Sequence, residues 1–403
     1  MTSFRPRQSP RKPAGRLAPV LAPAVDGDAD EPADRGTRDP LAHDAAADDL
    51  AQVRLVLADV VSRLDPATRR LCSYHLGYTD EHGRPDRPSG KGVRPLLTLL
   101  STRAAGASAR SGVPAAVAVE LVHNFSLLHD DVMDGDTERR HKPTAWAAFG
   151  RSEAILAGDA LLVLASEVLA ESGAAAATSA IRCLHAATRR LIAGQMADLA
   201  FESRRDVTVP ECLGMAQDKT GALLSCAASL GAVLAGGPAE VTLGLSEFGD
   251  HLGLAFQLED DLLGIWGDPA VTGKPIRSDL RSAKKSLPVV AALGSGTSAG
   301  GRLAEHYPTS GQRTEEQLVE MARLIEAAGG RQWARDLADH ELSCALDALS
   351  GLPIPADVAD ELEQLASRLS QDVLSGVPAG PSAPEWLVAG ELEANVTMDA
   401  EVC

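Results

Sequence analysis

The sequence has few aromatic residues and too little positive charge for a general affinity for nucleic acid. Aromatic residues make up 3% of the 403 residues, and the formal net charge is −18. The overall field of such an acidic protein does not hold it on a polyanion, so we expect no nucleic-acid partner. Local arginines and lysines can still reverse the field inside one pocket, which leaves an anionic small substrate open.

Cysteine patterns typical of zinc sites are absent. None of the six cysteines forms a C-x-x-C pair or lies beside a histidine cluster, so we expect free thiols rather than zinc or disulfides. No run reaches ~18 apolar residues, the length of a transmembrane helix. The Arg- and Pro-rich N-terminus lacks the apolar region of a secretory signal. We therefore expect a cytoplasmic protein without stable membrane insertion.

Both ends of the chain have the composition of tails. Residues 1–46 are rich in Pro, Asp, Arg and Ala without a sustained period, and such a segment cannot bury enough surface to offset its ordering entropy. Residues 375–403 begin with closely spaced Gly and Pro and end in an acidic segment. We predict a disordered N-terminal tail, a folded domain over residues 47–374 and a flexible C-terminal tail.

Between the tails the hydrophobic period is helical. Apolar residues recur at i, i+3, i+4 and i+7, and β-branched runs of period two are scarce. Glycine and proline interrupt the pattern at residues 236–238, 294–301 and 351–355. The sequence predicts an all-α fold, a single large bundle of roughly ten or more helices. Its clearest helical segments are residues 115–131, 152–170, 180–201, 209–235 and 247–265.

The first chemically informative cluster is an aspartate-rich helix end. Asp130 and Asp134 are four residues apart and share one helical face, with Asp131 beside them. Two such carboxylates repel each other unless a cation lies between them, and Mg²⁺ suits them because it also shares phosphate oxygens. Taken alone, the string fits an ordinary acidic surface better, because such strings are common by chance. Arg139 and Arg140 follow, and arginine forks bind phosphate, so the block indicates a metal-bridged diphosphate site.

A second block repeats this order of acids and cations. Gln257 lies three and four residues before Asp260 and Asp261, so one helical face presents an amide and carboxylates. Lys274 and Lys284 follow within the next residues. Either block alone could be a solvated charged surface. Two such helix ends in one all-α protein indicate two walls of a single metal–diphosphate cavity.

A third basic motif lies upstream. Residues 90–95 read Gly-Lys-Gly-Val-Arg-Pro, where the glycines allow close backbone approach and Lys91 and Arg94 can meet a phosphate near a helix N-terminus. The P-loop pattern and a preceding strand are missing, which excludes that type of nucleotide site. His123 lies seven residues before Asp130 and is either a core histidine or part of the site.

These blocks in this order resemble the trans-isoprenyl diphosphate synthases, or polyprenyl synthetases, over roughly residues 50–370. The resemblance implies an isoprenoid synthase type I fold around a deep central cavity, a homodimer, and a prenyltransferase that condenses isopentenyl diphosphate with an allylic diphosphate. It also implies about three Mg²⁺ ions per site with substrate bound. Asp130, Asp134 and Asp260 would bind the metal, with support from Asp131 and Asp261.

The resemblance assigns the surrounding polar residues as well. Positions that hold isopentenyl diphosphate match Lys91, Arg94, His123 and Arg140. Positions that hold the allylic diphosphate match Arg139, Lys219, Thr220, Gln257, Lys274 and Lys284, and a further polar pair is Gln195 and Asp198. The catalytic group, which stabilises charge on the departing diphosphate, would be Asp130, Asp131, Asp134, Arg139, Lys219 and Asp260.

Two positions depart from the family pattern. The second motif of most relatives ends in aspartate where this chain has Gly264, and Asp268 lies four residues beyond, too far to occupy the same turn. We expect activity to survive, because the resemblance marks this carboxylate as the more dispensable one. His141 follows the paired arginines where many relatives have glycine, and we expect a small effect.

The helix of the first motif is expected to set the length of the product. Phe125 and Ser126 lie five and four residues before Asp130, where a bulky side chain stops the growing chain. This pair resembles that of synthases making twenty-carbon geranylgeranyl diphosphate. Phe125 could instead only pack in the bundle with another helix as the floor, so farnesyl and longer polyprenyl products remain alternatives.

Two other functions stay open. A type I terpene cyclase shares the fold, but it would need an Asn/Asp-Asp-x-x-Ser-x-x-x-Glu motif on the opposite wall, which this sequence lacks. It would also have no use for a second diphosphate site. A non-catalytic subunit that regulates an active partner would account for Gly264 but not for the intact first motif.

Overall fold

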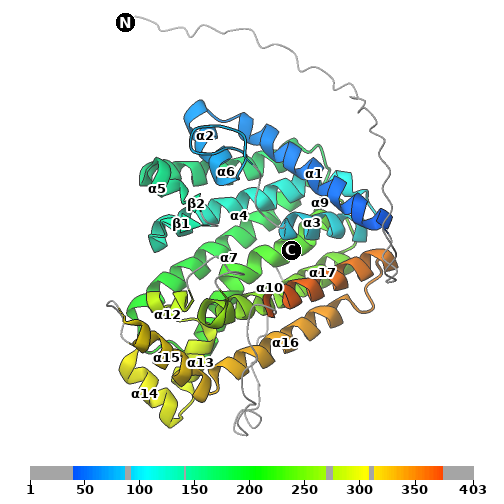
Figure 1. The fold of residues 1–403 in the computed structure, drawn as a ribbon. Helices are drawn as coiled ribbons and strands as arrows, with labels where there is room; N and C mark the ends of the chain where they lie inside the picture. The colour runs from blue at the N-terminus through cyan, green and yellow to red at the C-terminus, as the bar shows by residue number, and fades with distance from the viewer. Residues whose placement is uncertain (1–39, 87–91, 140–141, 269–275, 308–312, 375–403) are drawn as a thin grey trace, which may run out of the picture. The chain divides into compact units, whose positions relative to one another are not determined.

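The Ala- and Leu-rich periodic sequence forms helices almost throughout the structure. The computed structural model describes residues 40–86, 92–139, 142–268, 276–307 and 313–374. Within these ranges the named strands are β1 (Glu138–Arg139) and β2 (Lys142–Pro143), a two-stranded antiparallel hairpin in which Glu138 pairs with Pro143. The all-α fold predicted from the sequence is confirmed (Figure 1).

The helices follow one another with short connections. Those before the hairpin are α1 (Pro40–Ser62), α2 (Pro66–His75), α3 (Val93–Ala104), the 3₁₀ helix η1 (Ala109–Gly112) and α4 (Val113–Asp134). The middle of the chain forms α5 (Ala145–Phe149), α6 (Arg151–Glu171), α7 (Ala177–Ser203), α8 (Val209–Ala216), the π-helix η2 (Gln217–Gly221), α9 (Ala222–Leu234) and α10 (Ala239–Trp266). The remaining helices are α12 (Ser278–Ser282), α13 (Leu287–Gly294), α14 (Ser298–His306), α15 (Glu315–Ala327), α16 (Gly330–Leu349) and α17 (Ala356–Leu374).

All five helical segments predicted from the sequence are helical in the structure. The segment at residues 209–235 continues through α8, η2 and α9, but it contains a π-helical turn that the apolar period did not reveal. The predicted breaks at residues 236–238 and 351–355 each separate two helices, whereas the break predicted at 294–301 is confined to residues 295–297 between α13 and α14. Helix α1 begins at Pro40, within the segment assigned to the N-terminal tail. Residues 1–39 and 375–403 lie outside the described residues, so the two tails stay predictions.

Local side-chain chemistry starts several of these helices. The Asp65 carboxylate accepts hydrogen bonds from the backbone N–H groups of Ala67 and Thr68 at the start of α2. A reciprocal capping box of Thr208 and Glu211 starts α8. Such caps satisfy N–H groups that have no partner inside the helix. The starts of α2 and α8 are therefore encoded locally.

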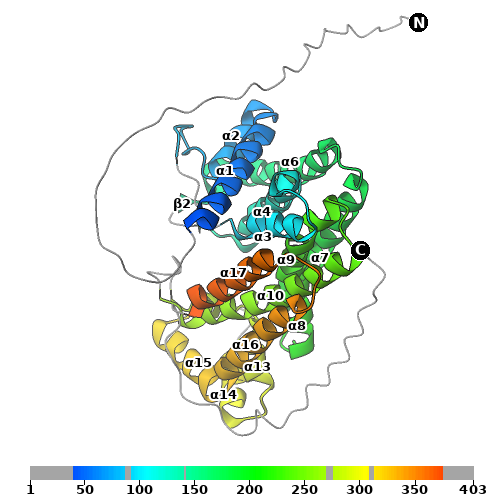
Figure 2. The same cartoon turned by 90° about the vertical axis from the view of Figure 1, so that its right-hand side faces the viewer.

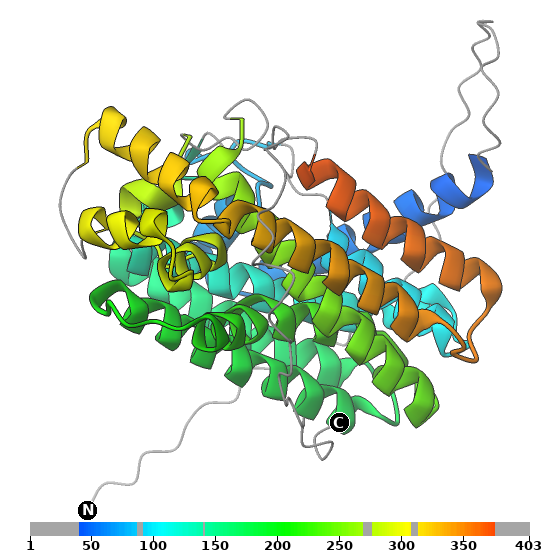
Figure 3. The ribbon, with the colours of Figure 1, turned by 90° about the horizontal axis from the view of Figure 1, so that it is seen from below.

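The helices from Ala42 onward belong to one compact unit built around α4, α9 and α10. Helix α10 packs against α9 and α16, α4 packs against α6, and α3 packs against α9. Figures 2 and 3 show α16 and α17 running side by side along α10. A smaller apolar cluster joins α12, α13, α14 and α15 beneath the C-terminal end of α10. This cluster supports the segment that carries Lys284.

The close packing of α10 depends on glycine. A Cβ on Gly249 would lie 2.6 Å from Ser225 Cα, and a Cβ on Gly253 would lie 2.6 Å from Gly221 Cα. Real Cβ atoms do not approach backbone atoms so closely. Helix α10 can therefore contact α9 and η2 at these points only because residues 249 and 253 have no side chain. Gly253 therefore brings α10 directly against the π-helix η2.

The five cysteines in the described ranges are free, as predicted: Cys72, Cys183, Cys212, Cys226 and Cys344. One described helix, Ala109–Asp134, is long and apolar enough to span a membrane by length and composition, although the sequence predicted no such span. Within its most apolar window 72% is buried inside the fold. Buried core helices of globular proteins pass the same test.

Candidate active site

The C-terminal end of α4 forms the first wall of the site. Gly135 adopts a left-handed conformation (φ 72°), which ends the helix directly after Asp134. The following hairpin returns Arg139 to the helix end, where its Nε and Nη2 atoms lie 2.8 Å and 2.7 Å from Asp131 Oδ1. Asp131 is 2% exposed. It therefore holds Arg139 in place.

Burial and mutual repulsion make the ionised forms of the carboxylates on this wall unfavourable. The pKa of Asp130 is raised to about 6, because burial disfavours its charged form and Asp134 and Asp198 repel it, while Lys219 and Arg139 oppose the shift. The pKa of Asp134 is raised by the same loss of hydration and by Asp198, against the attraction of Lys219. A nearby cation stabilises the charged form of such carboxylates.

The π-helix η2 presents Lys219 to the site. A Cβ on Gly194 of α7 would lie 2.2 Å from the Lys219 backbone nitrogen, so only glycine lets α7 approach this turn. One turn later on α7, the Asp198 carboxylate lies 2.5 Å from Lys219 Nζ. Gly194, Asp198 and Lys219 thus form one unit, and π-helical turns often occur at functional sites.

The second wall is held by a chain of hydrogen bonds from η2 to α13. Thr220 Oγ1 donates to Gln257 Oε1 at 2.5 Å, and Gln257 Nε2 donates to Asp261 Oδ1 at 2.8 Å. The other Asp261 oxygen accepts the backbone N–H of Leu287, the first residue of α13, at 2.8 Å. Asp261 is 2% exposed, and burial raises its pKa to about 7. Asp260, next to it, is exposed.

Lys284 connects the electrostatics of the two walls. Burial lowers the pKa of this ammonium, but attraction by Asp279, Asp261 and Asp198 raises it overall above its usual value. The same ammonium lowers the pKa of Asp134 on the first wall. Residues far apart in the sequence therefore contribute to one electrostatic field.

A third group of residues lies beside the first wall. Arg94 Nη1 is 3.4 Å from His123 Nε2, which places α3 and α4 residues predicted for one substrate next to each other. Burial lowers the pKa of Arg94, and the negative charge of Glu120 opposes this shift. Arg94 Nε is buried without a hydrogen-bond partner among the described residues. A buried guanidinium with spare donors suits an anionic ligand.

Comparison with known proteins decides the family. Residues 86–325 match the polyprenyl synthetase family. The chain belongs to this family. It is a trans-prenyltransferase, as the resemblance implied.

Two curated relatives from Mycobacterium tuberculosis cover most of both chains. A (2E,6E)-farnesyl diphosphate synthase is 51% identical over 77% of this chain and 88% of its own length. A geranylgeranyl diphosphate synthase is 41% identical over 73% of this chain and 85% of its own.

Solved structures share the same fold. A polyprenyl synthetase from Streptomyces coelicolor A3(2) has 48% identity and a TM-score of 0.77, covering 80% of this chain and 98% of its own. A geranylgeranyl pyrophosphate synthase from Corynebacterium glutamicum, complexed with isoprenyl diphosphate and magnesium, has 28% identity and a TM-score of 0.69, covering 82% and 98%. The family uses a divalent metal.

The residues present in this synthase fit a magnesium ion. The donors are all carboxylate oxygens, and the buried Asp131 Oδ2 has no hydrogen-bond partner among the described residues. No group of three or more Asp, Glu, His or Cys in the described part of the chain could hold an ion by itself. Mg²⁺ does not need such a group, because it binds through one or two carboxylates, waters and substrate phosphates.

Several sequence predictions concern residues outside the described ranges, namely Lys91, Arg140, His141 and Lys274. The Gln195 side chain is buried, and both polar atoms of its amide lack a hydrogen-bond partner among the described residues. Such an amide is free to meet a ligand or water.

The two residues predicted to limit the length of the product are both buried on α4. Phe125 is 6% exposed, and its ring meets the edge of His129 at 4.8 Å between centroids. Ser126 is also buried and donates its hydroxyl to the His123 carbonyl at 2.8 Å.

Sequence reasoning missed three contributors to this site. Glu120 lies within electrostatic range of Arg94, one turn before His123 on α4. The sequence pattern assigned no role to Asp279 or to Gly194. For Glu120 the spacing along the helix was a usable signal. Gly194 and Asp279 depend on contacts between helices that no local pattern shows.

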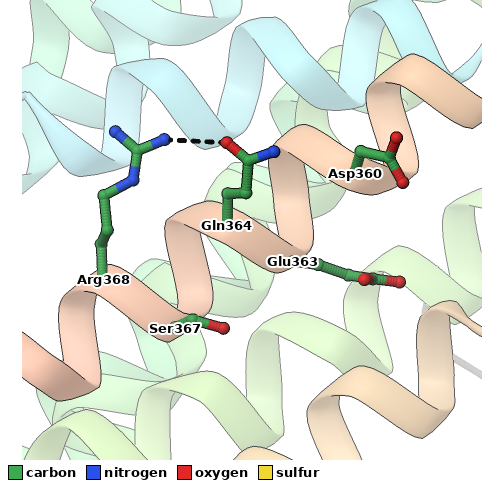
Figure 4. Close-up of a pocket in the computed structure, with 5 residues that line it drawn as sticks. All are labelled: Asp360, Glu363, Gln364, Ser367 and Arg368. Carbon is green, nitrogen blue, oxygen red and sulfur yellow. Dashed lines mark hydrogen bonds between the residues drawn. The ribbon is translucent and has the colours of Figure 1, made fainter. Parts of the chain in front are cut away.

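A separate cavity of about 320 Å³ lies on α17 and is lined by Asp360, Glu363, Gln364, Ser367 and Arg368. Figure 4 shows that all five side chains come from this one helix, with Arg368 donating to Gln364 at 3.2 Å. None of the predicted site residues lines it. The cavity is therefore distinct from the two aspartate walls.

The approach of α7 to η2 generates the first prediction. Gly194→Ala should lower kcat/KM for prenyl transfer about 100-fold, because the added methyl group displaces the Lys219 backbone by an amount that catalysis does not tolerate. Gly214→Ala on α8, where a Cβ meets nothing within 4 Å, is the matched control. Steady-state kinetics with circular dichroism of both variants measures the difference. Equal activity of the two variants would contradict this account of η2.

Proposed function

We propose that this prenyltransferase condenses isopentenyl diphosphate with an allylic diphosphate by metal-assisted ionisation. The observation that carries the proposal is the shared field of the two aspartate walls around Lys284 and Lys219. Acids and cations alternate there in the arrangement that a metal-bound diphosphate requires. The printed activities of the two mycobacterial relatives support the same substrates.

The described residues divide the work of the reaction. Arg139, Lys219 and Lys284 would bind the diphosphate of the allylic substrate and stabilise the charge that grows as its C–O bond breaks. Arg94 and His123 would hold isopentenyl diphosphate so that its double bond faces the carbocation. The released diphosphate accepts the final proton in this proposal, so no side-chain base is needed.

Magnesium is the proposed metal, with about three ions per site when substrate is bound. When bound, the metal neutralises the diphosphate and makes it a better leaving group. The proposed ligands are Asp130, Asp134 and Asp260. Asp130 and Asp134 lie at the C-terminal end of α4, and Asp260 is next to Asp261 on α10. Calorimetric titration with Mg²⁺ and inorganic diphosphate counts the ions.

Two short-chain products have specific support. Phe125 is buried on α4 ahead of Asp130 and favours the twenty-carbon geranylgeranyl diphosphate through its bulk. The 51% identity to a farnesyl diphosphate synthase favours the fifteen-carbon product. Both belong to the same reaction and differ only in the number of condensations.

We further propose a cytoplasmic homodimer without stable membrane insertion, a location that cell fractionation tests. Support for the dimer comes from the neighbouring helices α6 and α7, which expose apolar side chains. Leu156 and Val163 are 64% and 58% exposed, and Met196 is 65% exposed. Leu156 and Val163 are seven residues apart and lie on one face of α6. Such a patch suits a second copy of the chain.

Labelled isopentenyl diphosphate, incubated with each of dimethylallyl, geranyl and farnesyl diphosphate, tests the main proposal. We expect longer linear diphosphates that disappear when EDTA removes magnesium. Asp130→Asn should lower the rate at least about 100-fold, because it removes charge stabilisation at the reacting centre. Asp268→Asn, an exposed acid outside the two motifs, is the control. A cyclic hydrocarbon would indicate a terpene cyclase, and no product with any primer would favour a non-catalytic subunit.

The assignment of Phe125 as the side chain that stops the growing chain predicts a change in product length. Phe125→Ala should give a longer polyprenyl diphosphate than the wild type, because the truncated side chain no longer blocks the growing chain. Phe149→Ala on α5, where the ring packs against Tyr74, is the control and should leave the length unchanged. Chromatography of the dephosphorylated products measures both. An unchanged length for Phe125→Ala would place the floor on another helix.

The dimer proposal predicts a change of mass in solution. Leu156→Asp should shift the protein from dimer towards monomer in light scattering, because a charge enters the apolar patch of α6. Leu243→Asp is the matched control, since Leu243 is 53% exposed on α10 and not on α6 or α7. A monomeric wild type, or an equal shift in both variants, would contradict the assignment.

A further inference from the structure

Helix α7 meets the π-helix η2 through three residues spaced one turn apart. Arg190, Gly194 and Asp198 follow one another at intervals of four residues and lie on the same side of α7. Gly194 and Asp198 contact the backbone and the ammonium of Lys219. Arg190 Nε donates to Asp218 Oδ1, in the residue before Lys219, at 2.9 Å. Because each residue of a helix rises about 1.5 Å, η2 is attached to α7 at two points roughly 12 Å apart.

The same arginine also reaches α10. Arg190 Nη1 lies 3.4 Å from Asp250 Oδ1, and the other Asp250 oxygen accepts a hydrogen bond from Ser225 Oγ on α9 at 3.1 Å. Burial lowers the pKa of Arg190, but its hydrogen bond to Asp218 and the charge of Asp250 raise the pKa overall. One guanidinium therefore connects α7 to η2 and to α10, and through Asp250 to α9.

We propose that Arg190 is a positioning residue for prenyl transfer, because it fixes the π-turn in the orientation that directs Lys219 to the diphosphate. The inference rests on the proposed function, in which Lys219 stabilises the charge of the departing diphosphate. Asp198 holds only the end of the flexible Lys219 side chain. Arg190 holds the turn itself through Asp218, so that the two attachments together prevent the turn from rotating about either one.

The chemistry of arginine suits this role. Its planar guanidinium donates in two directions at once, whereas the ammonium of a lysine is a point charge on a flexible stem. Asp218 is 37% exposed and Asp250 is 22% exposed. Ion pairs at partly exposed sites contribute little to the free energy of unfolding. Loss of Arg190 is therefore expected to change the position of Lys219 more than the stability of the fold.

An alternative role for Arg190 is to hold α7 against α10 without any effect on Lys219. That role predicts a lower Tm and an unchanged rate of the chemical step when Arg190 is neutralised. A positioning role predicts a lower rate at saturating substrate with an unchanged KM for isopentenyl diphosphate. The KM is unaffected because Arg94 and His123 lie on α3 and α4, away from the turn.

The test measures the single-turnover rate of the first condensation at saturating substrate, the KM for isopentenyl diphosphate and Tm, with the full chain, Mg²⁺ and the fastest of the three allylic primers. Arg190→Gln and Asp218→Asn should each lower the rate about 10-fold. The double variant should be no slower than either single variant, because both changes remove the same contact. Arg190→Lys should recover part of the rate, since it keeps a positive charge near Asp218.

Arg103→Gln is the matched control. Arg103 also forms two ion pairs between helices, to Asp357 and Glu361 across α3 and α17, and its side chain is 30% exposed against 38% for Arg190. The control variant should keep the wild-type rate whatever it does to Tm, because neither of its partners adjoins η2.

The outcomes separate this inference from the proposed function. A rate for Arg190→Gln equal to that of Arg103→Gln would overturn the inference, even if the wild type elongates substrates normally. Additive losses in the double variant would also overturn it, because Arg190 would then not act through Asp218. If Arg190→Gln does not fold, Asp218→Asn carries the same test at a more accessible residue. A wild type that transfers no prenyl group to any primer would overturn the proposed function, and the role of Arg190 with it.

Discussion

Repulsion among partly buried carboxylates is the constraint on which the rest of this site depends. Asp130 and Asp134 on one wall and Asp261 on the other all have raised pKa values because the fold removes their water. Such groups are tolerated only if cations are close, and Lys219 and Lys284 are positioned for this purpose. In the proposed function, a bound cation would offset the remaining negative charge of the carboxylates. Lys219 and Lys284 would then interact with an anionic substrate.

The cations reach their places because helices approach without side chains between them. Gly194 admits the Lys219 turn and Gly253 admits Gly221, so the π-helix is held between α7 and α10. An ordinary α-helical turn in this stretch would rotate Lys219 relative to α9. The cost of a π-turn is offset by packing on both sides. Function and close packing are therefore inseparable here.

The sequence predicted what depends on local pattern. The helix period, the caps and the i, i+4 spacing of Asp130 and Asp134 follow from neighbouring residues, so the all-α fold and the first wall could be predicted. The resemblance assigned Thr220 and Gln257 to the allylic substrate and Asp261 to support of the metal ligands, but the sequence did not predict their connected path to Leu287. Its geometry depends on how three helices pack, and no period encodes that.

Gly264 shows why the absence of one acidic residue from a motif is weak evidence of lost function. Read along the chain, a glycine replaces an acid and the second wall is short of one charge. In three dimensions the Asp279 carboxylate, fifteen residues further along, occupies the space that a Cβ at residue 264 would need. A metal responds to the positions of oxygen atoms and not to the helix that carries them. In the proposed function, phosphate oxygens and waters would complete the coordination. The walls are then complementary to the metal and the diphosphate together, so charge stabilisation develops only when the substrate is bound.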